Sequence, residues 1–146
     1  MSYNIEQINS GSVSLTAAGL AEGTNANTYK TTNTLAYTVN GVFKSKGATD
    51  NVAMTAGVGT VPPSSAALYG VWIDGSGNFS NTRGPVVETG APCPVPSAPA
   101  GDVALVGLIK VTTNSSTTFT PGSTDLGAAG VTDVYLDCMV MPGSAQ

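Results

Sequence analysis

The chain has 146 residues with five basic and nine acidic side chains, so only 10% of it is charged and its net charge is −4. Globular domains usually carry about 25% charged residues; here glycine, hydroxyl and amide side chains take their place. This length predicts one domain with its own hydrophobic core. The few basic residues are scattered and form no basic stripe, which argues against nucleic-acid binding.

The cysteine and histidine content restricts the chemistry. The chain has no histidine, which excludes histidine-based triads, general bases and metal ligands. Cys138 alternates with apolar residues of a predicted strand, so we expect a small core residue. Cys93 stands between Pro92 and Pro94 and is expected to be exposed or packed under a loop. A disulfide between the two is poorly supported in a reducing compartment.

The first residues, MSYNIEQINSGS, have neither the basic nor the apolar part of a signal peptide. The chain also has no run approaching 18 apolar residues, so no membrane span is predicted, and we expect synthesis and folding in a cytoplasm. Residues 1–12 are polar and are expected to form an extended N-terminal arm. The β domain is then expected to occupy residues 13–146.

The first elements are short. Residues 15–23, LTAAGLAEG, predict at most two turns of helix closed by a glycine. Residues 34–46, TLAYTVNGVFKSK, predict a β-hairpin, because Asn40-Gly41 between two alternating runs is typical of a type I′ turn. That turn pairs Val39 with Val42, and we expect Lys44 and Lys46 to lie in solvent.

Two further strand regions follow. Residues 52–61 predict a strand interrupted by glycines and ended by Pro62-Pro63. Residues 67–83, ALYGVWIDGSGNFSNTR, predict a second hairpin, with a heavily apolar first strand, a turn at residues 74–77 and a short return strand. This hairpin contains the only tryptophan.

Residues 84–100, GPVVETGAPCPVPSAPA, contain five prolines. Such density favours polyproline II and excludes a central strand. Two interpretations remain for this segment. It is either a long loop that crosses from one sheet to the other or an extended arm that lies on a neighbouring subunit.

Residues 102–113, DVALVGLIKVTT, are the stretch around which the fold is expected to be organised. Both faces are apolar as far as Lys110, and the β-branched content favours a central strand over a buried helix. Residues 115–121 predict a Thr-rich strand or turn, and residues 131–141 a closing strand. In that strand we expect the following residues to point inward: Val134, Leu136, Cys138 and Val140. We expect the alternate residues to point outward: Asp133, Tyr135, Asp137 and Met139.

Strands separated by Gly, Pro and Asn turns, with almost no helical periodicity, predict an all-β fold. We expect a single-domain β-sandwich or barrel, with a jelly roll among the arrangements that fit, carrying the N-terminal and Pro-rich arms.

No catalytic, cofactor-binding or metal-binding residues are predicted, and the protein is not expected to be an enzyme. Asp133 and Asp137 are separated by about 13 Å of strand, which exceeds the roughly 5 to 9.5 Å between paired glycosidase carboxylates. Residues 74–78 have the oxygen-bearing residues of a calcium loop, but Phe79 and Pro85 occupy the places of its glycine and final carboxylate. We therefore expect a plain turn there.

The strongest candidates for function are interface residues. Trp, Tyr and Arg are enriched at binding hot spots, although Trp and Tyr also fill sandwich cores. The candidate interface comprises Tyr69, Trp72, Phe79, Arg83, Pro92, Pro94 and Pro96.

Three stretches, residues 14–51, 67–84 (ALYGVWIDGSGNFSNTRG) and 99–137, resemble small virion structural proteins of tailed bacteriophages. The similarity covers most of the chain except the proline-rich middle. The shared features are Thr- and Gly-rich β patterns rather than catalytic motifs. The resemblance implies a non-enzymatic protein of the phage particle.

Within that class we expect a capsid decoration, or cement, protein on the head surface of the virion, synthesised in the host cytoplasm. The resemblance implies two partners, the major capsid protein and further copies of this chain in a homotrimer, with no nucleic acid and no membrane. The alternative is a host-receptor-binding module of a tail or head fibre. An exposed aromatic patch around Trp72 would favour that alternative.

Overall fold

The computed structural model describes residues 11–139, which form an all-β fold with a single short 3-10 helix. Of the expected N-terminal arm, residues 1–10 lie outside the described residues, as does Val140 of the closing strand. The elements are β1 (Val13–Ser14), β2 (Leu20–Glu22), β3 (Thr28–Thr31), β4 (Leu35–Val39), β5 (Val42–Lys46), β6 (Thr49–Ala53), η1 (Ala56–Val58), β7 (Ser65–Asp74), β8 (Phe79–Arg83), β9 (Val87–Glu88), β10 (Val103–Thr113) and β11 (Val131–Asp137).

The largest sheet has the strand order β11-β10-β7-β8, with β9 pairing to the start of β7. All its pairs are antiparallel. β7 and β10 are the two long central strands, and most residues in both are buried. The prediction that residues 102–113 form the central strand is confirmed.

A β-bulge in β10 changes which residues share a face. Leu105 pairs with Trp72 and Gly107 with Val71, so Val106 is an extra residue on β10. Such a residue shifts the alternation of the strand by one. Leu105 and Ile109 therefore belong to opposite faces, whereas on a strand without a bulge two residues four apart would share one face.

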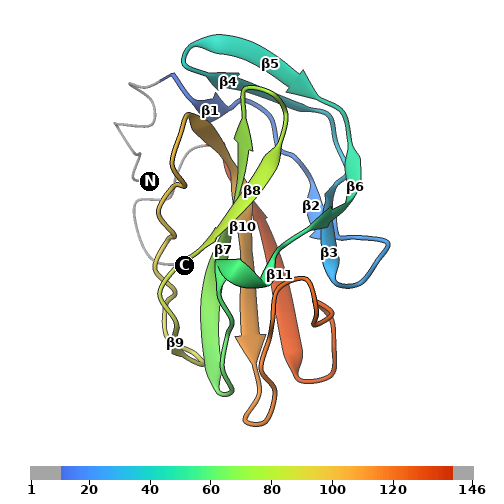
Figure 1. Ribbon diagram of the computed structural model, residues 1–146, viewed down its shortest axis with the longest axis vertical. Helices are drawn as coiled ribbons and strands as arrows, with labels where there is room; N and C mark the ends of the chain where they lie inside the picture. Colours follow the sequence, from blue (N-terminus) through green and yellow to red (C-terminus); the bar gives the residue numbers. More distant parts are fainter. Residues whose placement is uncertain (1–10, 140–146) are drawn as a thin grey trace.

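The opposite layer consists of two three-stranded sheets, β1-β4-β5 and β2-β3-β6. The chain runs from β1 into β2, from β3 into β4 and from β5 into β6, so the two sheets are consecutive halves of one bent layer. Figure 1 shows them following one another along the upper and right-hand side of the large sheet. The fold is thus an open sandwich rather than a closed barrel.

The main core lies between these layers. Tyr29, Leu35 and Tyr37 come from the bent layer, while Tyr69 and Ile109 come from the large sheet; all five are at most 1% exposed. Burying a large apolar side chain contributes roughly 1.5 to 3 kcal/mol. This core therefore supplies much of the free energy that holds the two layers together.

The first hairpin has the predicted geometry. Val39 pairs with Val42 and Tyr37 with Lys44. Asn40 and Gly41 have φ values of 52° and 77°, as a type I′ turn requires. The hydrogen bonds of this turn therefore determine the register of β4 and β5.

Two other predictions differ from the structure. Residues 15–23 contain β2 instead of a helix, because Gly19 has φ 68° and the Ala18 carbonyl accepts hydrogen bonds from the Thr32 and Asn33 amides. The strand predicted over residues 52–61 ends at Ala53 and is followed by η1. Farther on, only an isolated bridge between Val61 and Phe119 remains.

The proline-rich segment, residues 84–100, is a loop that packs on its own domain. Its Cys93 is fully buried and Pro96 is buried against the outer face of the large sheet. The Thr82 hydroxyl donates a hydrogen bond to the Ser97 carbonyl over 2.8 Å. The strands before and after this segment, β8 and β10, belong to the same large sheet, so the prediction of a loop that crosses from one sheet to the other is wrong. The alternative, an arm on a neighbouring subunit, is not confirmed.

In β11 the predicted inward and outward faces are exchanged over most of the strand. Val134 and Leu136 are 55% and 42% exposed, whereas Tyr135 is partly buried against the main core. The Tyr135 face meets the bent layer, and the other face lies where the proline-rich segment does not cover the sheet. Cys138 is buried as expected and Met139 is exposed as expected.

Replacement of Gly107 by alanine tests the close packing beside the bulge. A Cβ there would meet the Leu136 carbonyl oxygen and the Leu20 side chain at distances that real Cβ atoms do not show. We expect Gly107→Ala to lower the free energy of unfolding by about 1 to 3 kcal/mol. Gly47→Ala is the matched control, because a Cβ there meets nothing within 4 Å. Equal denaturation midpoints for the two variants would contradict the described packing.

Candidate functional site

The residues predicted as an interface are divided by the large sheet. Tyr69 pairs with Arg83 and Ile73 with Phe79, which places Tyr69, Phe79 and Arg83 on the inner face. Trp72 lies three residues after Tyr69, and side chains an odd number of residues apart on a strand point to opposite faces of the sheet. Trp72 therefore lies on the outer face, where it meets the proline-rich segment. The aromatic residues of the candidate interface therefore do not form one surface.

Tyr69 is a core residue. Its side chain is fully buried, its hydroxyl donates a 2.6 Å hydrogen bond to the Gly59 carbonyl, and its ring packs edge to face on Phe119. Burial raises the pKa of Tyr69 well above its usual range. The hydroxyl is therefore an internal structural donor.

Trp72 is the centre of a second, smaller core on the outer face. It is 1% exposed and clusters with Leu68, Leu105 and Cys93. Its indole Nε1 donates a 2.9 Å hydrogen bond to the Thr82 hydroxyl. Since that hydroxyl in turn holds the proline-rich loop, Trp72 fixes the loop on the sheet and offers no exposed aromatic patch.

The remaining candidates are partly accessible. Phe79 and Arg83 are half-buried; the Phe79 ring packs edge to face on Tyr29, and Arg83 donates a hydrogen bond to the Thr60 carbonyl. Among the prolines, Pro92 is exposed, Pro94 is half-buried and Pro96 is buried.

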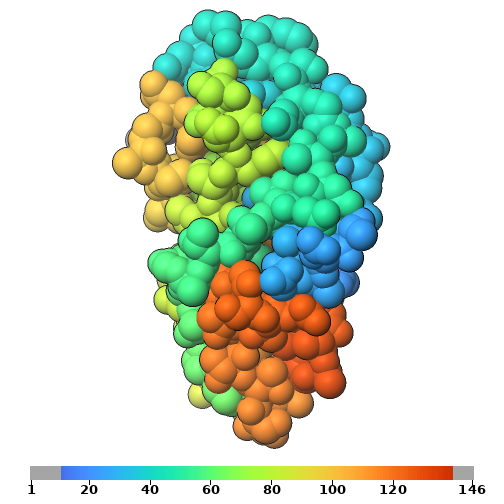
Figure 2. Space-filling model, turned by 45° about the vertical axis from the view of Figure 1, so that its right-hand side comes forward, coloured from blue at the N-terminus to red at the C-terminus, as the bar shows by residue number. Residues whose placement is uncertain are grey.

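A shallow groove lies between β6, η1 and β8, where Figure 2 shows the yellow-green β8 beside the teal residues 50–58. It encloses about 280 Å³ and is lined in part by Thr55, Phe79 and Asn81. The Asn81 amide donates to the Gly70 carbonyl and accepts from the Tyr29 hydroxyl. Two internal hydrogen bonds thus fix the amide at this groove.

Within residues 11–139 the exposed large apolar side chains lie in two regions of the fold. The first, here called the hairpin patch, consists of Leu15, Val42 and Phe43 around the first hairpin. Phe43, 64% exposed, shares a face of this sheet with Leu15, whereas Val42 is exposed beside the turn on the Val39 face. The second, here called the edge patch, consists of Val134 and Leu136 on the outer face of β11, together with Met139 just beyond the end of that strand. Isolated exposed apolar residues are normal, but clusters of them indicate contact surfaces.

The edge patch borders an apolar groove of about 200 Å³. Cross-strand pairing aligns Leu68, Lys110 and Val134 in one row and places Leu108 beside Leu136 in the next. The proline-rich loop covers the neighbouring part of the same sheet face. The groove is thus the uncovered continuation of the outer core.

One of these patches could have been found from the sequence. The Asn-Gly turn aligns Phe43 with Thr38, on the face opposite to Tyr37 and Val39. A buried Tyr37 and Val39 therefore imply an exposed Phe43. For β11 the sequence does not indicate which face is buried, because one face is apolar and the other carries the large aromatic residue Tyr135.

The acidic turn at residues 74–78 is a plain turn, as expected. The Asp74 carboxylate accepts hydrogen bonds from the Asn78 and Ser76 amides, and these bonds lower its pKa. Within residues 11–139 no three His, Cys, Asp or Glu side chains are placed to hold a metal ion. The same part of the chain has no helix long and apolar enough to cross a membrane.

No protein-family model, curated protein or solved structure gives a significant match to this chain.

The role of Trp72 can be tested by truncation. We expect Trp72→Ala to cost about 3 to 5 kcal/mol in the free energy of unfolding, because it empties the outer core and frees the loop. Phe43→Ala, at an exposed aromatic, should change it by less than about 1 kcal/mol. Chemical denaturation followed by circular dichroism measures both, and a small effect at Trp72 would place that residue at a surface.

The two free thiols report on the closure of the loop over the sheet. Cys93 and Cys138 are both buried; burial raises the pKa of Cys93, and burial together with Asp137 raises the pKa of Cys138 to about 11. A raised pKa leaves little thiolate at pH 8, so we expect slow labelling by a thiol reagent in the folded protein. Both thiols should react fast in denaturant. Fast labelling of folded Cys93 would show that the loop opens.

Proposed function

We propose that the chain is a non-enzymatic structural protein of a tailed-phage particle, a capsid decoration or cement protein. The observation that supports this proposal is the segregation of the exposed large apolar side chains into the hairpin patch and the edge patch. Interface centres are depleted in charge and rich in apolar contacts. A protein lying between neighbouring subunits needs two such attachment points.

In this proposal the partners are the major capsid protein and further copies of the chain in a homotrimer, on the head surface of the virion. Neither nucleic acid nor membrane is involved. Each copy adds binding free energy only to the expanded shell, which opposes rupture of that shell by the packaged DNA. The low charge of the surface reduces the desolvation cost of such contacts.

The alternative, a receptor-binding module of a tail or head fibre, would be favoured by an exposed aromatic patch around Trp72. Trp72 is 1% exposed and lies beneath the proline-rich loop. The observation that would favour the alternative is therefore missing from the described surface.

The decisive experiment adds purified protein to particles that lack it and images them by electron microscopy. We expect additional density at regular positions over the icosahedral shell, with greater resistance of those particles to heat and osmotic shock. Density only at the tail or at fibre tips would overturn the proposal and direct attention to a host receptor. Particles incubated with the destabilised Trp72→Ala protein serve as a control for specific binding of the folded domain.

A further inference from the structure

Both apolar patches include residues of edge strands. β5 is the last strand of the sheet β1-β4-β5, and β11 is the last strand of the large sheet. An edge strand presents backbone groups without a sheet partner, so it is a template for pairing with another chain. Val42 and Phe43 lie on β5, and Val134 and Leu136 on β11.

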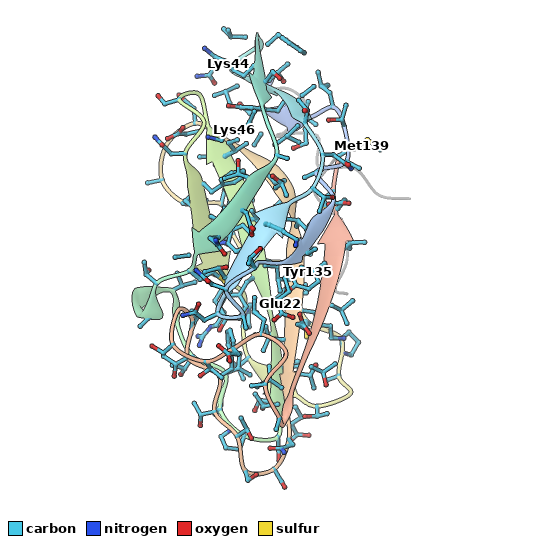
Figure 3. The ribbon with its side chains drawn as sticks, turned by 90° about the vertical axis from the view of Figure 1, so that its right-hand side faces the viewer. Glu22, Lys44, Lys46, Tyr135 and Met139 are labelled. Atoms are coloured by element: carbon cyan, nitrogen blue, oxygen red, sulfur yellow. The ribbon has the colours of Figure 1, made fainter. Side chains whose placement is uncertain are left out.

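The two edges differ in charge. β5 carries Lys44 and Lys46, whereas β11 carries Asp133 and Asp137. Glu22 on β2 lies near β11, and its charge and that of Asp133 add to burial in raising the pKa of Tyr135. Figure 3 shows the two lysines toward one end of the molecule and Tyr135 with Glu22 nearer its middle. The β5 edge is thus basic, and one face of β11 is acidic.

The charged residues around β5 and β11 do not cancel this difference in charge between the two edges. Lys110 of β10 pairs with Val134 and lines the groove beside the edge patch on the outer face of the sheet, opposite to the face that carries the two aspartates. Near β5, the Asp74 carboxylate is held by amides of its own turn, and the Asp102 carboxylate accepts a hydrogen bond from the Asn40 side chain of the hairpin turn. The Leu20 amide donates to the Asp137 carboxylate and fixes its position beside the β11 edge.

These charges select one pairing among three. Two β5 edges would place lysines against lysines, and two β11 edges would place aspartates against aspartates; like charges on facing strands are destabilising. A β5 edge facing a β11 edge combines opposite charges with two apolar patches. Charge complementarity of this kind favours one partner and rejects the others.

We propose that the β5 edge of one copy binds the β11 edge of a second copy, joining the hairpin patch of the first to the edge patch of the second. The contact is heterologous, because each copy contributes a different surface. Such contacts close into a ring when the rotation between copies permits and otherwise extend into a filament. This inference does not depend on where a particle would hold the protein.

The test uses two variants of the full chain, each disabling one edge. Phe43→Asp places a charge in the hairpin patch and Leu136→Asp places one in the edge patch; both positions are exposed, so the fold should tolerate them. Val42→Asp and Val134→Asp are replacements if either variant unfolds. Thr118→Asp, at an exposed position outside both patches, is the control.

Size-exclusion chromatography with light scattering over a concentration series gives the masses. We expect the unmodified protein and Thr118→Asp to self-associate, less so as salt rises, and each patch variant alone to run as a monomer. An equal mixture of Phe43→Asp and Leu136→Asp should form a dimer and nothing larger, because only one intact pair of edges remains. A monomeric unmodified protein, an effect of only one variant, or a mixture that stays monomeric would overturn the inference.

A charge exchange provides an independent test. Lys44→Glu and Asp133→Lys should each weaken self-association, and the double variant should recover it because the opposite charges are restored with their places exchanged. Lys30→Glu and Asp125→Lys are matched controls that change the same charges elsewhere. Loss of association that the double variant does not recover would overturn the proposed pairing. None of these measurements involves phage particles, so they stand apart from the test of the proposed function.

Discussion

The pairing of β7 with β10 is the interaction on which the rest of the structure depends. Both strands are long and apolar on both faces, so each face of the sheet they form must be covered by another part of the chain. The bent layer of six short strands covers one face and encloses the aromatic core. The proline-rich loop covers part of the other face around Trp72. Where that second cover ends, Val134 and Leu136 remain in solvent.

A proline-rich segment suits this covering role for a physical reason. Proline has no backbone N–H, so a segment rich in it can lie on an apolar face while leaving few buried donors to satisfy. Its restricted φ angle also lowers the entropy that is lost when the loop becomes ordered. Residues 84–100 thereby seal the outer core with few backbone hydrogen bonds, and the indole and hydroxyl of Trp72 and Thr82 hold them in place.

Local chemistry allowed much of the fold to be predicted from the sequence, and long-range packing accounts for what was not. The Asn40-Gly41 turn predicts a hairpin and the apolar run over residues 102–113 predicts a central strand, and both patterns depend only on residues that are close together in the sequence. The bulge at Val106 depends on the partner strand, and the orientation of β11 depends on which face the bent layer covers. The candidate interface residues do not form one surface, because Tyr69 and Trp72, three residues apart on a strand, cannot share a face. Phe43 was predictable from the hairpin register, whereas the exposure of Leu136 was not.

Within residues 11–139 the chain passes between the two layers of the sandwich only once, through residues 54–64. All six strands of the bent layer precede this connection and all strands of the large sheet follow it. The molecule is therefore two contiguous pieces of sequence joined by one tether, and the aromatic core is the contact between them. The segment that forms the bent layer and the segment that forms the large sheet are thus complementary fragments. The tether serves mainly to keep them close together, which raises the effective concentration at which they meet.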